Sequence, residues 1–224
     1  MLVVSPATVL DNAEVRARWE GFAWTAANAA KAKAIIARYP EGRQASAVIP
    51  LLDLAQRQVG AETETQGWLP IPVQEYVGRE LGMAPVRVLE VTTFYTMFNL
   101  APVGKYHVQV CGTTPCLLRG SDDVLEACYK RGLKKGETTA DGLFTLTEVE
   151  CLGACANAPM VQINDDNFED LTEASVGAIL DALAAGQSPK PGPQIDRQTS
   201  CAEGGPTNLK KMAERNYDYR GQWA

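Results

Sequence analysis

The sequence contains a single histidine, His107, among its 224 residues, and this scarcity excludes several kinds of metal centre. A catalytic zinc site built mainly on histidines needs more than one, and a Rieske iron–sulfur centre needs two. His107 lies in a stretch that alternates like a β-strand. We therefore expect a structural histidine whose hydrogen bonds are satisfied, not a metal ligand or a proton relay.

Long apolar runs, basic clusters and phosphate-binding motifs are also missing. No segment approaches the roughly 18 uncharged apolar residues of a membrane helix, so we expect no direct membrane span. The net charge is -6 with no basic stripe, which argues against nucleic acid as a partner. No G-x-G-x-x-G motif opens a helix after a strand. The N-terminal segment lacks the pattern of a secretory signal or transit peptide, so we expect a cytoplasmic chain with reduced thiols.

Residues 1–100 are predicted to form a helical N-terminal domain. An alanine-rich helix is expected to end at Pro40, and the next one, with an apolar stripe, to begin with Ser46 as its N-cap. Pro72 and Pro85 are each expected to open a further helix, because the first amides of a helix have no intrahelical partner.

Residues 101–186 have the pattern of an α/β domain. Two strands and then a hairpin are predicted, with a helix capped by Ser121 after the first strand and a helix capped by Thr172 after the hairpin. The order β-α-β-β-β-α predicts a mixed sheet of four strands.

Residues 187–224 are predicted to be a proline-rich spacer and a tail. The segment 187–193 is expected to be extended and semi-rigid. Two interpretations of the tail stay open. It is either a disordered end or a partner-binding segment that orders on its partner, because its rings would otherwise be exposed. The rings are Tyr217, Tyr219 and Trp223.

Four of the six cysteines form two tight pairs at predicted strand ends. Cys111 and Cys116 follow the first strand, and Cys151 and Cys155 follow the second. Binding sites gather on loops that leave the strand ends of an α/β sheet, so the four thiolates are predicted to converge.

Several chemistries use paired cysteines. Disulfides need an oxidising compartment, which nothing in the sequence supports. A zinc site with four cysteine ligands stays open, although its commonest spacing is C-x2-C and neither pair has it. A [2Fe-2S] cluster fits best, because each iron takes two thiolates and the wider C-x4-C and C-x3-C pairs can supply them.

A family resemblance covers most of residues 20–185. The run FYTMFNLAPVGKYHVQVCGTTPCLLRG, together with ECLGACANAPMVQINDDNFEDLT, closely resembles the 24-kDa subunits of NADH:quinone oxidoreductase, respiratory complex I. The resemblance implies a thioredoxin-like ferredoxin domain behind a helical domain. It also implies one [2Fe-2S] cluster, since the family's cysteine pattern matches at Cys111, Cys116, Cys151 and Cys155.

The resemblance further implies an electron-transfer subunit with no substrate site of its own, held at the inner membrane through its complex. FMN and the NADH site would belong to a partner flavoprotein subunit of the same NADH dehydrogenase module, and the cluster would exchange single electrons with that flavin. The equivalent diaphorase subunit of an NAD-reducing hydrogenase or a formate dehydrogenase is an alternative. A zinc-stabilised structural subunit is the alternative from another class.

The other conspicuous residues are predicted to be structural. Cys128 lies on the apolar face of its helix and is expected in the core, whereas Cys201 is expected to be a free thiol in the tail. Pro159 is a candidate for a cis peptide, because thioredoxin-like folds often carry one before the strand expected there. A run of aromatic residues is interpreted as interdomain packing and not as a cofactor shelf: Phe94, Tyr95 and Phe98.

Overall fold

The computed structural model describes residues 5–202, 204–205 and 208, so the tail rings named above lie outside the described residues. The chain forms two compact units. One runs from the N-terminal end to Gln109 and includes Cys128–Glu148, and the other comprises Val110–Ala127 and the chain from Val149 onward. The predicted domain limits near residues 100 and 186 stay a prediction.

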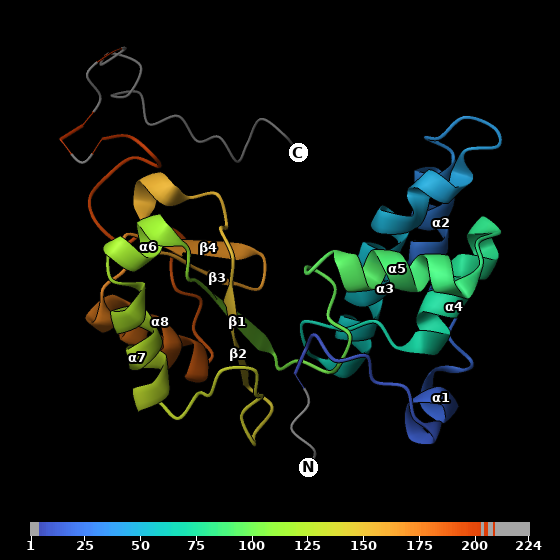
Figure 1. The fold of residues 1–224 in the computed structure, drawn as a ribbon, viewed down its shortest axis with the longest axis horizontal. Helices are drawn as coiled ribbons and strands as arrows, with labels where there is room; N and C mark the ends of the chain where they lie inside the picture. Colours follow the sequence, from blue (N-terminus) through green and yellow to red (C-terminus); the bar gives the residue numbers. More distant parts are fainter. Residues whose placement is uncertain (1–4, 203, 206–207, 209–224) are drawn as a thin grey trace. The chain divides into compact units, whose positions relative to one another are not determined.

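The predicted helical character of the first hundred residues is confirmed (Figure 1). The helices are α1 (Ala13–Trp19), α2 (Ala26–Ile36), η1, a 3-10 turn (Gln44–Ala47), α3 (Val48–Thr63), α4 (Ile71–Leu81) and α5 (Pro85–Phe94). Prolines occupy the first turns of α4 and α5, and Gly82 ends α4 with a left-handed φ of 64°. The prediction for Ser46 is wrong: it lies inside η1, and α3 follows directly with Ala47 as a cap that makes no side-chain hydrogen bond.

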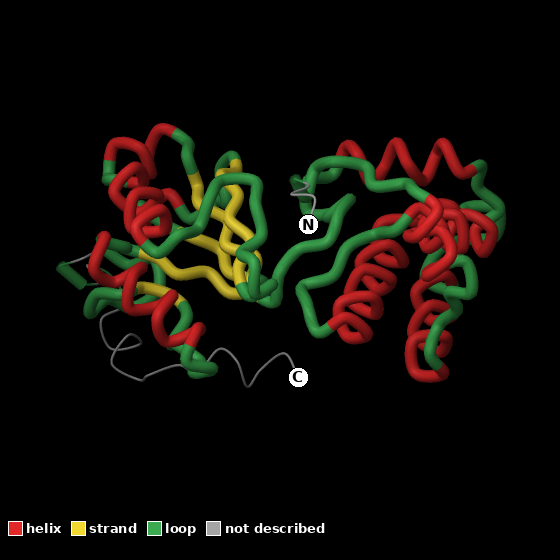
Figure 2. The backbone as a smooth tube through the Cα atoms, turned by 90° about the horizontal axis from the view of Figure 1, so that it is seen from below, coloured by secondary structure: helices red, strands yellow, loops and turns green. Residues whose placement is uncertain are grey.

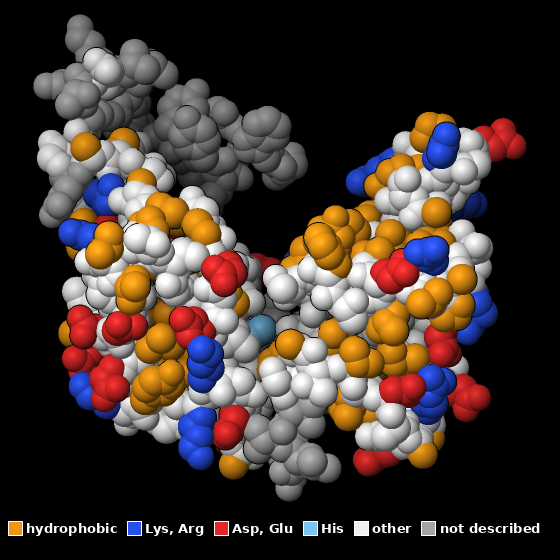
Figure 3. Space-filling view, viewed as in Figure 1, with side chains coloured by type: hydrophobic (Ala, Val, Ile, Leu, Met, Phe, Trp, Pro, Cys, Tyr) orange, Lys and Arg blue, Asp and Glu red, His pale blue; other side chains and the backbone are white. Residues whose placement is uncertain are grey.

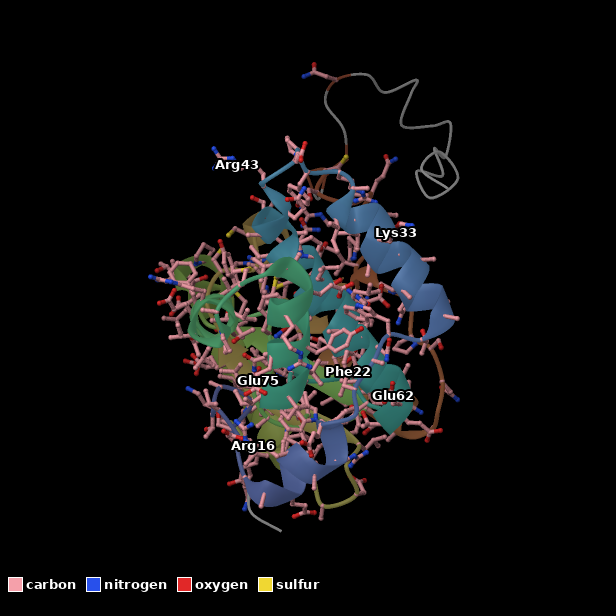
Figure 4. The ribbon with its side chains drawn as sticks, turned by 90° about the vertical axis from the view of Figure 1, so that its right-hand side faces the viewer. Arg16, Phe22, Lys33, Arg43, Glu62 and Glu75 are labelled. Carbon is pink, nitrogen blue, oxygen red and sulfur yellow. The ribbon has the colours of Figure 1, made fainter. Side chains whose placement is uncertain are left out.

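The helices α1–α5 share one apolar core. Its largest fully buried side chains include Leu51, Leu52, Leu69, Val73 and Val77. At its edge, the ring of Phe22 packs edge to face against Trp24 and Tyr76, at centroid distances of 5.5 and 5.2 Å. Figure 4 labels Phe22, Arg16 of α1 and Glu75 of α4. The guanidinium of Arg16 and the carboxylate of Glu75 form an exposed ion pair with a nitrogen–oxygen distance of 3.4 Å.

The strands form one mixed sheet in the order β2-β1-β3-β4-β5. Figure 1 labels β1 to β4, and Figure 2 draws the strands in yellow. They are β1 (Tyr106–Cys111), β2 (Phe144–Val149), β3 (Val161–Ile163), β4 (Asp166–Glu169) and β5 (Gly192–Pro193). The hairpin β3–β4 is antiparallel, and β4 pairs in parallel with β5. The predicted α/β class and mixed sheet are confirmed, but the sheet has five strands instead of four.

The fifth strand comes from the segment that was predicted to be only a spacer. Gly192 lies opposite Phe168 of β4, and the N–H of Gln194 donates to the carbonyl oxygen of Glu169 at 2.9 Å. Proline lacks an N–H and is tolerated in a sheet mainly at an edge, where this strand lies. The proline-rich composition predicted an extended backbone for this segment. Its pairing with β4 could not be predicted, because it depends on the free edge of the folded sheet.

Three helices accompany the sheet: α6 (Thr114–Leu118), α7 (Ser121–Lys130) and α8 (Glu173–Ala184). Thr172 caps α8 as predicted, in a reciprocal capping box with Ser175. Ser121 is not a cap, because its Oγ atom is buried and has no hydrogen-bond partner among the described residues. None of the helices in the described part of the chain is long and apolar enough to cross a membrane.

Candidate metal centre

The two cysteine loops leave the sheet at neighbouring points. The N–H of Gly112, which follows β1, donates to the carbonyl oxygen of Val149, the last residue of β2, at 3.0 Å. The N–H of Cys111 donates to the carbonyl oxygen of Met160 at 3.3 Å, just before β3. The loop after β1 therefore begins beside the end of β2, from which the second cysteine loop starts.

The first cysteine pair is buried. Cys116 lies on α6, a short helix that was not predicted and that Pro115 helps to open. The side chains of Cys111 and Cys116 are each only 1% exposed and pack with Ala158 and Met160 in a small apolar cluster. These two sulfur atoms thus form the interior side of the candidate centre.

The second pair is exposed. The sulfur atoms of Cys151 and Cys155 lie 3.4 Å apart, and the N–H of Gly153 between them donates to the Cys151 sulfur at 3.4 Å. Gly153 has a φ of 82°, a left-handed conformation that glycine adopts without a steric penalty. Cys155 begins the short 3-10 turn η2 (Cys155–Asn157), which carries the loop back toward β3.

The thiol pKa values differ within the buried pair. Burial raises the pKa of the Cys111 thiol, but hydrogen bonds from Thr113 and the backbone of Leu152 outweigh it, and the pKa lies below its ordinary value. Burial, together with the hydrogen bond and charge of Cys111, raises the pKa of Cys116 to about 12. The Cys111 thiol is therefore the more acidic of this pair and the Cys116 thiol the less acidic.

The two thiols of the exposed pair also have shifted pKa values, one lowered and one raised. The hydrogen bond from the Gly153 backbone, and then that from Cys155, lower the pKa of Cys151. The hydrogen bond with Cys151, burial and the nearby negative charge raise the pKa of Cys155. The charge of Cys111 acts on all three other thiols, so the four sulfur atoms form one electrostatic group.

This donor set suits iron in a sulfide cluster. It offers four sulfur atoms in two pairs, together with backbone and hydroxyl donors that stabilise negative charge on sulfur. Within the described residues, no group of three or more His, Cys, Asp or Glu side chains is placed so that it could hold one metal ion. The assignment of Cys111, Cys116, Cys151 and Cys155 as ligands stays a prediction.

Sequence reasoning missed several residues around the centre. The hydroxyl of Thr113 lies 3.3 Å from the Cys111 sulfur, and its position two residues after that cysteine was an available signal. Arg119 follows Cys116 by three residues, and its Nε–H donates to the carbonyl oxygen of Ala158 at 3.5 Å. Arg197, which contacts the second cysteine loop, was not anticipated, since 41 residues separate it from the carbonyl it binds on Ala156.

The predictions for the remaining conspicuous residues mostly hold. Cys128 is fully buried, and burial raises its pKa to about 11. His107 is buried, forms a 2.9 Å hydrogen bond with Thr147, and has a pKa lowered to about 4 by burial. Cys201 is unpaired and partly exposed, and the Ala158–Pro159 peptide is cis.

The three residues of the aromatic run are divided between the core and the surface. Phe98 is buried in the helical core, only 3% exposed. Phe94 and Tyr95 pack edge to face against each other on the surface, where 77% and 41% of their areas are exposed. The interdomain packing expected of these two residues stays a prediction.

Comparison with known proteins gives a consistent result. The sequence profile of the thioredoxin-like [2Fe-2S] ferredoxin family matches residues 32–184. A subunit of the NADH-quinone oxidoreductase of Rickettsia conorii is 60% identical over 153 residues, which cover 68% of this chain and 88% of the relative. The corresponding polypeptide of Rickettsia bellii is 55% identical over 163 residues, covering 72% of this chain and 94% of the relative.

A solved structure is also similar in part. The NAD+-reducing [NiFe]-hydrogenase in its H2-reduced state aligns with 60% of this chain and 22% of the hydrogenase chain, at 18% sequence identity and a TM-score of 0.49. A likeness at this level is too weak to bear on function.

Proposed function

Since this chain belongs to the thioredoxin-like [2Fe-2S] ferredoxin family, we propose that it is the subunit of an NADH-quinone oxidoreductase that carries single electrons. The membership confirms the predicted thioredoxin-like ferredoxin domain and the [2Fe-2S] cofactor. The chain acts as part of an oxidoreductase complex and not as an enzyme by itself.

One observation carries the assignment of the site: the two loops that hold four of the six cysteines begin side by side after β1 and β2, and the charge of Cys111 acts on the other three thiols. Two of the four are buried and two are exposed. These four, Cys111, Cys116, Cys151 and Cys155, would hold the cluster. When bound, a cluster of this kind accepts and releases one electron at a time. The thiols of Cys116 and Cys155, whose pKa values are raised, must lose their protons to serve as ligands.

The chain's own residues then determine how the centre works. The apolar packing of Ala158 and Met160 around the first pair excludes water from the interior side. The exposure of Cys151 and Cys155 leaves the other side at the protein surface, where an electron can pass to or from a partner. The hydrogen bonds from Thr113 and Gly153 offset the negative charge on sulfur.

The electron donor in this proposal is a flavoprotein subunit that holds FMN and binds NADH, alongside other subunits of the module. Hydrophobic side chains gather on the surface over α5 and the segment after it (Figure 3), and they include the exposed Phe94, Tyr95 and Met97. Apolar patches of this kind commonly mark protein interfaces. The complex would keep the chain on the cytoplasmic side of the inner membrane as a peripheral subunit.

Serine replacements test the ligand assignment. In the reduced, cluster-loaded chain, Cys116→Ser and Cys155→Ser should abolish or strongly alter the [2Fe-2S] electron paramagnetic resonance signal. Cys128→Ser and Cys201→Ser are matched controls that should leave it intact. Loss of the signal in either control would contradict the assignment.

A reconstitution experiment tests the electron-transfer role. The purified, cluster-loaded chain should show no NADH-dependent ferricyanide reduction, and on addition of the flavoprotein subunit its cluster should become reducible by NADH. Cluster reduction by NADH without any flavoprotein would disprove the proposed role.

A further inference from the structure

Arg197 lies in the segment after β5, beyond residue 184, where the family match ends. Its side chain is only 9% exposed and forms a 2.7 Å ion pair with Asp170, whose side chain is 6% exposed. A buried cation is tolerated only when it is paired and its hydrogen-bond donors are satisfied. The contacts of Arg197 therefore belong to a defined arrangement and not to a chance surface pair.

The guanidinium of Arg197 contacts three carbonyl or carboxylate groups at once. Its Nε and one terminal nitrogen donate to the carbonyl oxygen of Cys201 at 2.9 and 2.7 Å. The terminal nitrogens donate to the carbonyl oxygen of Ala156 at 3.2 and 3.3 Å, and one of them also donates to Asp170. These bonds use all the donors that a guanidinium possesses.

Ala156 is the middle residue of the turn η2 and directly follows Cys155. Arg197 thus joins the C-terminal segment to the backbone of the exposed cysteine loop. Asn157 extends the same contact, because its side-chain nitrogen donates to the carbonyl oxygen of Thr199 at 2.9 Å. The N–H of Asp170 in turn donates to the carbonyl oxygen of Asn157 at 2.7 Å.

Backbone geometry gives independent support. Asp170 and Thr199 both have left-handed φ values, 53° and 47°, although neither is a glycine. Such a conformation is unfavourable for a β-branched residue like threonine and persists only where the surroundings enforce it. Both residues belong to the contact between the C-terminal segment and the η2 turn.

We propose that Arg197 is a positioning residue for the second cysteine pair, which fastens residues 197–201 onto the η2 turn and so holds Cys155 and Cys151 in place for the cluster. The inference rests on the proposed function. Within the loop itself, the N–H of Asn157 donates to the carbonyl oxygen of Ala154 at 2.9 Å, and Arg197 adds a contact from outside the loop.

The shape of the side chain matters in this proposal as well as its charge. Lysine has the same charge but only three donors on a single nitrogen, so it cannot reach three acceptors arranged around a planar fork. Arg197→Lys therefore separates the geometric role from a purely electrostatic one. Arg87, in an exposed pair with Glu90 whose side chains are 67% and 54% exposed, offers a matched control.

The test uses the full chain loaded with its cluster. The rate of iron release to a chelator and the visible circular dichroism of the oxidised cluster are compared among wild type, Arg197→Met, Arg197→Lys and Arg87→Met. Arg197→Met should release iron on the order of tenfold faster and change the visible dichroism, which reports the geometry of the ligands. Arg197→Lys should be intermediate, and Arg87→Met should match wild type.

Wild-type release rates and spectra in both Arg197 variants would overturn the inference. If Arg197→Met fails to fold, the milder Arg197→Lys decides by the same two measurements. Full retention of the wild-type behaviour in Arg197→Lys would show that charge alone acts, against the proposed geometric role. A wild-type chain that binds no cluster would overturn the proposed function and this inference together.

Discussion

The hydroxyl oxygen of Thr113 lies 3.3 Å from the sulfur atom of Cys111, in the same loop. Burial raises the pKa of the Cys111 thiol, and the hydrogen bond from this hydroxyl lowers it. The same hydroxyl also helps to lower the pKa of Cys151. Thr113 therefore stabilises negative charge on one cysteine from each pair. A hydroxyl that does this in the free protein is placed to do the same for cluster-bound thiolates.

Replacing Thr113 with valine should lower the reduction potential of the cluster. The substitution keeps the side-chain shape but removes a hydrogen bond that is stronger when the cluster carries the additional electron. We expect a decrease on the order of 50 mV. Potentiometric titration followed by electron paramagnetic resonance measures it, and Thr114→Val, on an exposed neighbour, is the control. An unchanged or higher potential in Thr113→Val would contradict the role.

Removal of iron should loosen the cysteine loops and the elements next to them more than the helical core. The cluster would join two loops separated by 34 intervening residues, so its binding contributes to the stability of the fold around it. Hydrogen exchange followed by mass spectrometry should show faster exchange in β3, β4 and α8 after iron removal. In α3 and α4 the exchange should change little. An equal increase in both regions would refute this expectation.

The stability of the chain should fall as the pH is lowered through the range set by His107. Its folded pKa is about 4, below the ordinary value of 6.5, so the unfolded chain binds more protons between these two values. The free energy of unfolding should therefore decrease by about 2 kcal/mol between pH 7 and pH 5, with the loss levelling off below about 4. Urea unfolding at the two pH values measures it.

His107→Gln is the control for that measurement. It removes the only histidine, and with it the main titration in this window, while leaving a polar group able to contact Thr147. The variant should lose clearly less stability than wild type between pH 7 and pH 5. If the free energy of unfolding depends on pH identically in the two proteins, the loss of stability comes from groups other than His107.

Gly67 should not tolerate a side chain. Its φ is 85°, and a Cβ atom at this position would lie 2.1 Å from the backbone oxygen of Gln56 in α3. Gly67→Ala should therefore lower the free energy of unfolding by about 3 kcal/mol. At Gly82, where φ is 64°, an added Cβ atom would have no other atom within 4 Å. Gly82→Ala should therefore lower the free energy of unfolding by only about 1 kcal/mol. Similar losses in the two variants, measured by urea unfolding, would show that the close contact does not decide the cost.

Much of this protein follows from local sequence signals. Prolines in the first turn of α4 and α5 and the glycine that ends α4 predicted helices that the structure contains. The hairpin β3–β4 and the cap of α8 were predictable for the same reason, since turn residues and capping side chains act within a few positions. The spacing of the cysteines favoured a [2Fe-2S] cluster over zinc, and the family resemblance then implied it.

Only the tertiary structure decided features that depend on residues far apart in the sequence. Nothing near Cys111 or Cys151 in the sequence shows that the first pair is buried and the second exposed. The pairing of β5 with β4 and the contact of Arg197 with Ala156 likewise depend on where the chain returns after α8. Composition and periodicity indicated helices such as α4 and α8, whereas α6, β5, burial and long-range hydrogen bonds depend on how the chain packs.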